Sequence, residues 1–468
     1  MNIDGVRARK GTANVRQLKI ETALGTVLAA LEVILLAACG GNTPPAQAPA
    51  PATAETTPTP PTTPTPTQLA NLSSGPSGGD LSGEAKSSYD RGFQAWTTGD
   101  LPGASAAFRD AVAKAPSSAA ARYSLGCVLE RLGDSQGALD AYRAAYTANP
   151  KNHESVSAYA VLLARLGRGA DAEQFLAGRL AQDPDSAALA TDLAEVKSIE
   201  GDSPGCQQLA QQALSKKPDY KDAMVVIARD YYRSHRWDLA RYALQAILDG
   251  AADGSIPPRD SGNPSALLLR ALVERDSGQR KQAIADFEEA ISRRPDLAEA
   301  YVNLGEMKLE AGNATEAELP LEKAARYSPN LAVVHLDLGD CYRLLGRTAD
   351  AKRELDAALR MDSTLAGVHY NLGLLYLFSQ SVPGASGEDD QLARAITELQ
   401  SYKSMRGAKV AKGQGDDVDE LLSTAKRKQS ELQLKKQAAA APPASGASSP
   451  SAPAAPASSG TAAPAKVH

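Results

Sequence analysis

The fold is decided by the stretch RYSLGCVLERLGDSQGALDAYRAAYTANP, residues 122–150, because its features recur along the chain at a fixed interval. Its last residue belongs to a series of prolines spaced 34 residues apart, namely Pro116, Pro150, Pro184 and Pro218. Pro295 and Pro329 repeat the same spacing further along. A fixed period of about 34 residues is typical of a helical solenoid, in which each unit is one helix-turn-helix hairpin.

Small side chains recur at positions 8 and 20 of this period. We place nine repeats, which begin near residues 85, 119, 153, 187, 221, 264, 298, 332 and 366. Position 8 holds Gly92, Gly126, Ala160, Ala194, Ala228, Ala271, Gly305, Gly339 and Gly373. Position 20 holds Ala104, Ala138, Ala172, Cys206, Ala240, Ala283, Ala317, Ala351 and, after an insertion, Ala395. The two helices of a hairpin cross at these places, and larger side chains would push their backbones apart.

This pattern resembles the tetratricopeptide repeat (TPR), and the segment AYVNLGEMKLEAGNATEAELPLEKAARYSP, residues 300–329, matches it as well as the first stretch does. The resemblance implies an all-α fold, a right-handed superhelix (α-solenoid) of about nine helix-turn-helix repeats. Repeats 1–5 are expected over residues 85–254 and repeats 6–9 over residues 264–405, with an insert at 255–263. Residues 406–437 carry leucines among charges, which predicts a polar helix that caps the last repeat.

The N-terminal region predicts a targeting segment. Five basic residues precede an apolar run over residues 23–38, which is too short to span a bilayer but suits a secretory signal over residues 1–38. The sequence Leu36-Ala37-Ala38-Cys39 resembles the lipobox of bacterial lipoproteins. That resemblance implies cleavage before Cys39 and attachment of acyl chains, palmitate among them, to this residue.

The segments at the two ends of the mature chain predict disorder. Residues 39–84 begin with the cysteine and are rich in Pro, Thr, Ala and Ser, and residues 438–468 are rich in Ala, Pro and Ser. We expect the first to be a tether and the second a tail. Residue 40 is Gly, whereas Asp at this place favours retention in the inner membrane of enterobacteria. By that resemblance the protein is lipid-anchored in the outer membrane and faces the periplasm.

Composition excludes some classes of partner. Removal of residues 1–38 takes away five basic and three acidic side chains, so 50 − 5 = 45 Lys and Arg remain against 55 − 3 = 52 Asp and Glu, a net charge of −7. A nucleic-acid partner would require a basic face, and we therefore expect none. Three cysteines besides Cys39 are far apart in sequence, and we expect all three to be small buried side chains. They are Cys127, Cys206 and Cys341.

No pattern of catalytic residues is present. His335 and His369 occupy position 4 of consecutive repeats, and two stacked imidazoles could bind a metal; core packing is the favoured interpretation because no further ligand stands at a suitable spacing. The chain contains no GxSxG motif, P-loop or dinucleotide-binding glycine pattern. We expect neither an enzyme, a cofactor, a metal nor a small-molecule substrate.

The TPR resemblance implies a concave groove lined by positions 2, 5, 9 and 12 of the first helix in each repeat. An aromatic stripe at its two ends could anchor an extended peptide or a helix of a partner protein. Burial of the same residues under the tether or the capping helix is the equally weighted alternative. The candidate contacts are Tyr89, Phe93, Trp96, Tyr123, Arg229, Tyr232, Asp340, Arg343 and Tyr370.

The overall plan is similar to the TPR lipoproteins of the adventurous gliding-motility machinery of myxobacteria. The resemblance rests on the LAAC box, the Thr/Pro tether, the long array and the closing segment HYNLGLLYLFSQSVPGASGEDDQLARAITELQSYKSMRG, residues 369–407. It implies a membrane-anchored scaffold that binds protein partners in a multiprotein cell-envelope complex. The alternatives are a pilotin-like assembly factor for the secretin of a type IV pilus or secretion system, and an accessory protein of cell-wall enzymes. Pilotins have fewer repeats and little tether.

Overall fold

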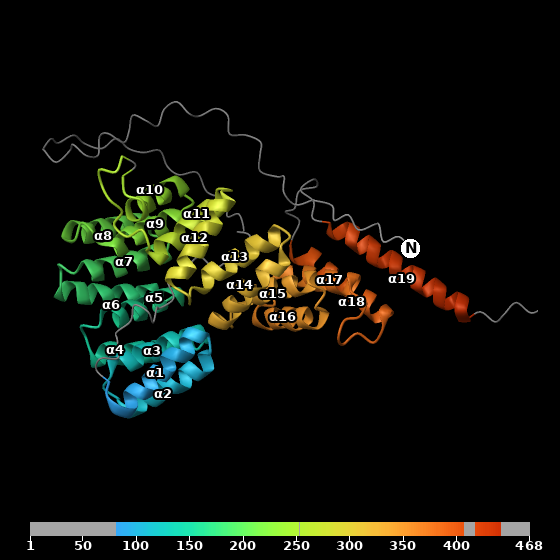
Figure 1. Cartoon of the computed structure of the whole chain (residues 1–468), viewed down its shortest axis with the longest axis horizontal. Helices are drawn as coiled ribbons and strands as arrows, with labels where there is room; N and C mark the ends of the chain where they lie inside the picture. The colour runs from blue at the N-terminus through green and yellow to red at the C-terminus, as the bar shows by residue number, and fades with distance from the viewer. Residues whose placement is uncertain (1–80, 252, 407–416, 441–468) are drawn as a thin grey trace, which may run out of the picture.

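The computed structural model describes residues 81–251, 253–406 and 417–440, and within these ranges every regular element is a helix. The predicted all-α array of about nine helix-turn-helix repeats is confirmed (Figure 1). Residues 1–80, which include the predicted signal segment, Cys39 and nearly all of the tether, lie outside the described part of the chain. So do residues 441–468 of the predicted tail.

Nineteen helices occur in the described ranges, two for each repeat and one after the last. The first helices of the repeats, here called the A helices, are α1 (Gly83–Thr98), α3 (Ala119–Arg131), α5 (His153–Arg165), α7 (Ala187–Ile199), α9 (Lys221–Arg233), α11 (Pro264–Asp276), α13 (Ala298–Glu310), α15 (Ala332–Leu344) and α17 (Ala366–Phe378). The second helices, here called the B helices, are α2 (Leu101–Lys114), α4 (Ser135–Ala148), α6 (Gly169–Gln182), α8 (Ser203–Lys216), α10 (Trp237–Leu248), α12 (Arg280–Arg293), α14 (Ala314–Tyr327), α16 (Thr348–Met361) and α18 (Glu388–Met405). The remaining helix is α19 (Val418–Ala440).

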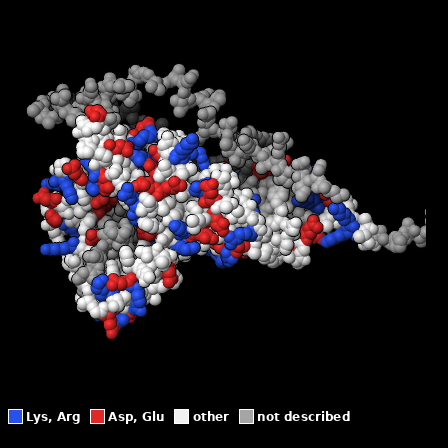
Figure 2. All heavy atoms as spheres, viewed as in Figure 1, with Lys and Arg blue, Asp and Glu red and all other residues white. Residues whose placement is uncertain are grey.

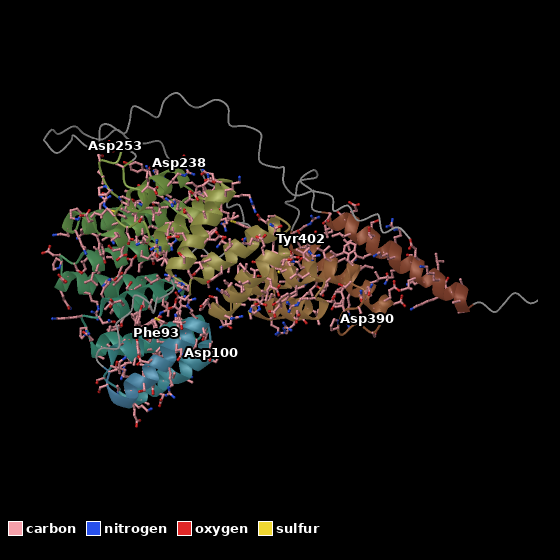
Figure 3. All side chains as sticks on the ribbon, viewed as in Figure 1. Phe93, Asp100, Asp238, Asp253, Asp390 and Tyr402 are labelled. Atoms are coloured by element: carbon pink, nitrogen blue, oxygen red, sulfur yellow. The ribbon has the colours of Figure 1, made fainter. Side chains whose placement is uncertain are left out.

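Short polar side chains and glycine set the ends of these helices. At the start of α2, Asp100 accepts a hydrogen bond from the backbone N–H of Gly103 (Figure 3), and such a cap satisfies one of the free N–H groups of the first turn. The same cap recurs at Asp134 before α4. Between α3 and α4 the chain turns at Gly133, whose φ of 79° lies in the left-handed region that favours glycine. These local signals recur with the period of the repeat.

The helix crossing in most hairpins depends on a small residue at position 8 facing a large one at position 24; in the fourth repeat both are alanine, Ala194 and Ala210. A Cβ atom added to Gly92 would lie 2.7 Å from the ring of Phe108, and one added to Gly305 would lie 2.5 Å from Leu321. At Gly126 it would lie within contact distance of the ring of Tyr142. The large partners fill the space that the small residues leave, so the two helices pack closely.

The remaining residues predicted at these crossings are also buried between helices. Position 20 is fully buried in every repeat, at Ala104, Ala138, Ala172, Cys206, Ala240, Ala283, Ala317, Ala351 and Ala395. Gly339 faces Leu355 and Gly373 faces Leu399, as at the other glycines of position 8. Cys127 and Cys341 are buried free thiols, like Cys206. The three cysteines therefore act as small packing residues, as the sequence indicates.

The array curves through space as its helices follow one another (Figure 1). Each helix packs on the next in sequence, and α7 also contacts α5 and α9, so these three A helices lie in a row. After α12 the array passes close to its own beginning, and α15–α18 then extend away from it. α19 packs on α18 through buried Val418, Leu421 and Leu422, while its far end carries an exposed Leu434.

The two stacked histidines each pair with a carboxylate. His335 faces Glu354 through Nδ1 at 2.8 Å and the carbonyl oxygen of Pro329 through Nε2 at 2.9 Å. Burial lowers the pKa of His335, but these two hydrogen bonds outweigh it and raise the pKa above its usual value. His369 pairs with Glu398 at 2.6 Å in the next repeat. Both histidines therefore join A and B helices.

Replacement of Gly126 by Ala tests the helix crossing. The added methyl group would press on the Tyr142 ring, and we expect a loss of roughly 1–3 kcal/mol in the free energy of unfolding. The matched control is Gly178→Ala in α6, where no atom lies within 4 Å of the added Cβ. There the same change should stabilise the protein by about 0.5–1 kcal/mol, since alanine favours helix. Urea unfolding of both variants checks the opposite signs; equal effects would contradict the packing described.

Candidate functional site

A buried arginine joins the second repeat to the sixth and seventh. Arg131 ends α3, and its Nη1 donates a hydrogen bond of 3.0 Å to the carbonyl oxygen of Tyr327 at the end of α14. Its Nη2 lies 3.5 Å from the carboxylate of Asp296, in the loop between α12 and α13. The guanidinium also lies over the ring of Trp96 at 4.9 Å from the ring centroid. Arg131 is thus held from three directions.

Further contacts reinforce this junction, which we call the closure. Tyr327 donates a hydrogen bond of 3.0 Å from its hydroxyl to the carbonyl oxygen of Thr97. Asn330 donates one of 3.5 Å to the carbonyl oxygen of Arg131. A Cβ atom added to Gly99 would lie 2.9 Å from the Cβ of Arg326, so the two surfaces meet tightly. The first seven repeats therefore form one closed turn.

The closed turn surrounds a cavity of about 380 Å³, lined mainly by A helices. A cavity of this size falls within the range of ligand sites in proteins. Its walls come from α3, α5, α7, α9, the start of α11 and the loop that follows α12. The lining residues are Tyr123, His153, Glu154, Ser157, Ala158, Val161, Thr191, Asp192, Glu195, Tyr220, Asp222, Val225, Val226, Asn263, Pro264, Ser265 and Arg294.

One wall of the cavity is acidic. Asp192 accepts a hydrogen bond of 2.8 Å from Ser157, while its second oxygen lies 3.4 Å from Nε2 of His153. Burial raises the pKa of Asp192 to about 6, against the opposing effect of His153. Glu154 and Asp222 line the same wall. This wall therefore favours a cationic group.

A buried ion pair supports the wall from behind. Glu195 accepts a hydrogen bond of 2.6 Å from Arg229 and one of 3.0 Å from Arg233. Burial raises the pKa of Glu195, but the two guanidinium groups outweigh burial and lower it below its usual value. Two charges on α9 and one on α7 are thus satisfied by one another, and they fix these helices side by side.

Arg294 lies on the cavity from the loop before α13, and its side chain is only 5% exposed. Burial lowers the pKa of its guanidinium. Its Nε lies 3.8 Å from the carboxylate of Asp296, beyond hydrogen-bonding range. The same carboxylate also faces Arg131. The lining of the cavity therefore includes a cation as well as acidic side chains.

Several of the predicted groove residues are buried inside the array and cannot present a surface to a partner. Trp96 is 2% exposed beneath Arg131, and Tyr89 packs on Phe108 with ring centroids 5.3 Å apart. Arg229 is taken up by Glu195. Tyr123 is nearly buried but does line the cavity. The aromatic residues of the first helices therefore serve the closure and the core.

The other predicted groove residues lie apart from the cavity. Phe93 on α1 is 39% exposed (Figure 3). Tyr232 donates a hydrogen bond to Asp276, and Arg343 pairs with Asp340 on its own helix. Tyr370 packs on Tyr402 and donates a hydrogen bond of 2.8 Å to Asp417, just before α19. The contact residues predicted from the sequence are thus distributed along the array. The cavity, in contrast, is lined by residues of one turn.

His153, Asp192, Glu195 and Arg294 were not among the residues predicted from the sequence. Asp192 stands at position 6 of its A helix, where Asp, Ser or Asn also occurs in five other repeats. An acidic residue at this position therefore gives no signal by itself. Arg294 lies in the loop between α12 and α13, at position 31 directly before Pro295, and other repeats carry unrelated residues at this position. Its role depends on the closure, which the sequence pattern does not show.

Some other kinds of site are not found in the described ranges. No group of three or more His, Cys, Asp or Glu side chains there is placed to hold a metal ion. None of the helices that could be searched there has the length and apolar character needed to cross a membrane. On the face seen in Figure 2, Lys and Arg lie interspersed with Asp and Glu.

Comparisons with known proteins identify the repeats. One family model described as tetratricopeptide repeat matches residues 89–153 and 268–332, and a second with the same description matches residues 129–195 and 308–369. TPR units are thus recognised in both halves of the array. None of the curated proteins compared with the chain matches it.

Three solved structures match the chain at low identity and with TM-scores below 0.5. The APC/C hetero-tetramer Cut9–Hcn1 is 14% identical with a TM-score of 0.48, covering 73% of this chain and 76% of that one. The human IFIT1 dimer with PPP-AAAA is 14% identical with a TM-score of 0.40, covering 74% and 81%. MamA is 18% identical with a TM-score of 0.31, covering 38% and 93%. These likenesses carry no functional argument.

Replacement of Arg131 by Met tests the closure. The change keeps the aliphatic stem but removes the contacts to Tyr327 and Asp296, and we expect a loss of roughly 3 kcal/mol. Hydrogen exchange should become faster around Gly99 and residues 294–297, with α16–α18 unchanged. The control Arg143→Met removes only an exposed pair with Asp140 and should change stability by less than about 0.5 kcal/mol. Unchanged exchange in Arg131→Met would show that the turn does not depend on this contact.

Proposed function

We propose that this array of tetratricopeptide repeats is a scaffold that grips a segment of a partner protein inside its closed turn. The observation that carries the proposal is the cavity of about 380 Å³ on the inner face, lined by residues from five A helices and one loop. It combines apolar side chains such as Val161 and Val225 with charges of both signs. That mixture is typical of sites that bind a ligand in a defined orientation.

A binding role also agrees with how the polar groups of the cavity are arranged. One oxygen of Asp192 and the Nε of Arg294 are buried without a hydrogen-bond partner among the described residues. Buried polar groups cost free energy when they stay unpaired, so proteins usually satisfy them. Both residues line the cavity, so a ligand bound there would lie beside them and could supply the missing partners.

The place of the scaffold in the cell is the second part of the proposal. Cys39 would carry the lipid, residues 39–84 would give reach from the membrane, and the array would face the periplasm from the outer membrane. Support for this comes from the Leu36-Ala37-Ala38-Cys39 sequence, the preceding basic and apolar segments, and Gly40. Three acyl chains would hold the protein stably, since two or more already suffice.

The partner would belong to a multiprotein complex of the cell envelope, and we propose the gliding-motility machinery. Support comes from the similarity of the overall plan and of residues 369–407 to TPR lipoproteins of that system. In the structure these residues form α17, the insert before α18, and α18 itself, over which α19 packs. They lie beyond the closed turn, so the scaffold has room for a second contact there.

A photo-crosslinking amino acid at position 265 tests the gripping role in cells. Ser265 lines the cavity at the start of α11, and we expect its replacement to yield crosslinks to a partner protein of the cell envelope. The matched control is the same amino acid at position 106, because Ala106 is exposed on α2 and does not line the cavity. Mass spectrometry of the crosslinked product identifies the partner. Crosslinks from position 106 alone would count against binding inside the turn.

Replacement of Cys39 by Ser tests the anchor. The variant lacks the thiol that accepts the lipid, so we expect it to remain uncleaved or to appear in the soluble periplasmic fraction. Labelled palmitate should enter the unchanged protein and not the variant. A variant that is still processed and still sediments with the outer membrane would show that the anchor lies elsewhere.

A further inference from the structure

The cation in the cavity is insufficiently satisfied by the protein itself. Arg294 is 4% exposed, and its buried Nε has no hydrogen-bond partner among the described residues. Its one ion pair within these ranges is the 3.8 Å approach of Nε to Asp296. A guanidinium has five N–H donors and stays charged in proteins, so burial without partners is costly.

The surroundings of Arg294 increase its demand for an anion. Asp296, the only ion-pair partner of Arg294 among the described residues, also lies 3.5 Å from Arg131. Arg131 and Arg229 oppose the charge of Arg294, whereas the carboxylates of Asp296 and Glu299 favour it. Arg294 therefore shares its ion-pair partner with a second guanidinium group.

The acidic wall of the cavity, in contrast, favours a cationic group. Within the described ranges one carboxylate oxygen of Asp192 has no hydrogen-bond partner, and Nε2 of His153 lies 3.4 Å from it. Asp192 is 7% exposed, and Glu154 and Asp222 line the cavity beside it. A cationic group entering the cavity would be attracted to this wall. A doubly charged phosphate would instead be repelled by it.

We propose that the cavity binds an extended peptide segment in which an acidic and a basic residue stand close together, with the carboxylate on Arg294 and the cation on Asp192. Arginine suits the first contact because its planar fork can donate two parallel hydrogen bonds to a carboxylate. This inference rests on the proposed function and specifies the chemistry of the segment that the scaffold grips. The opposed charges would also fix the direction in which the segment enters.

The test uses synthetic peptides and the full-length protein in detergent. The probes are biotinylated glycine-alanine peptides with one Lys and one Asp, in both orders and separated by zero to three alanines. Each is compared with its Gln, Asn and phosphoserine analogues. For at least one spacing we expect Lys with Asp to bind about tenfold or more tightly than either the Gln or the Asn analogue, since hydrogen bonds to charged groups are strong.

Variants assign the two contacts. Arg294→Gln should abolish the preference for Asp over Asn and keep the preference for Lys over Gln, and Asp192→Asn should do the reverse. The controls Arg109→Gln and Asp183→Asn, at exposed residues outside the cavity, should keep both preferences. Retention of the Asp preference in Arg294→Gln overturns the inference, as does the absence of any preference in the unchanged protein. Tighter binding of phosphoserine than Asp would assign the site to phosphopeptides and would overturn it as well.

A stability measurement separates this role from a structural one. An arginine needed for packing would lower the melting temperature when replaced, whereas an unsatisfied one should leave it unchanged or raise it in Arg294→Gln without peptide. A marked fall would contradict the inference. If position 265 still crosslinks to a partner while Arg294→Gln changes nothing, the scaffold function stands and the charge pairing fails. If position 265 gives no crosslink and no peptide binds, the proposed function fails too.

Discussion

The whole array depends on one steric constraint, which is the close crossing of two helices within each hairpin. Position 8 holds glycine or alanine, and in most repeats a large side chain at position 24 packs against it, as Tyr142 packs against Gly126 and Leu321 against Gly305. The same constraint recurs in successive repeats, so successive hairpins stack with similar geometry. Curvature of the array is the sum of these small rotations, and the A faces come to line its inner side.

The curvature brings the sixth and seventh repeats against the second, which does not happen in an open repeat array. Arg131 contacts Asp296, which lies 165 positions further along the chain, and Tyr327, which lies 196 positions further along. An ordinary solenoid is stabilised by contacts between neighbouring repeats alone. Here a contact from the second repeat to the sixth and seventh converts a groove into a cavity, and the charges on its walls come from repeats that are far apart in sequence.

The sequence predicted the hairpins well, but it did not indicate the cavity inside the turn, and the same physics explains both results. Helix starts such as Ala119, His153 and Ala332 follow from a repeated local pattern of small residues, caps and glycine turns. Trp96 was expected in a groove because it stands at a groove position, but the closure buries it under Arg131. Arg294 stands at a repeat position where the residue type varies, and only the three-dimensional course of the chain brings it to the cavity.

The closure also bears on how such a chain can change during evolution. Repeat genes commonly gain or lose whole units by duplication and deletion, and an open array tolerates this because each unit needs only its neighbours. In this chain, a unit added or lost between Arg131 and Asp296 would displace the two surfaces that meet there. The number of units in the first seven repeats is therefore constrained, whereas units after α14 remain free to multiply.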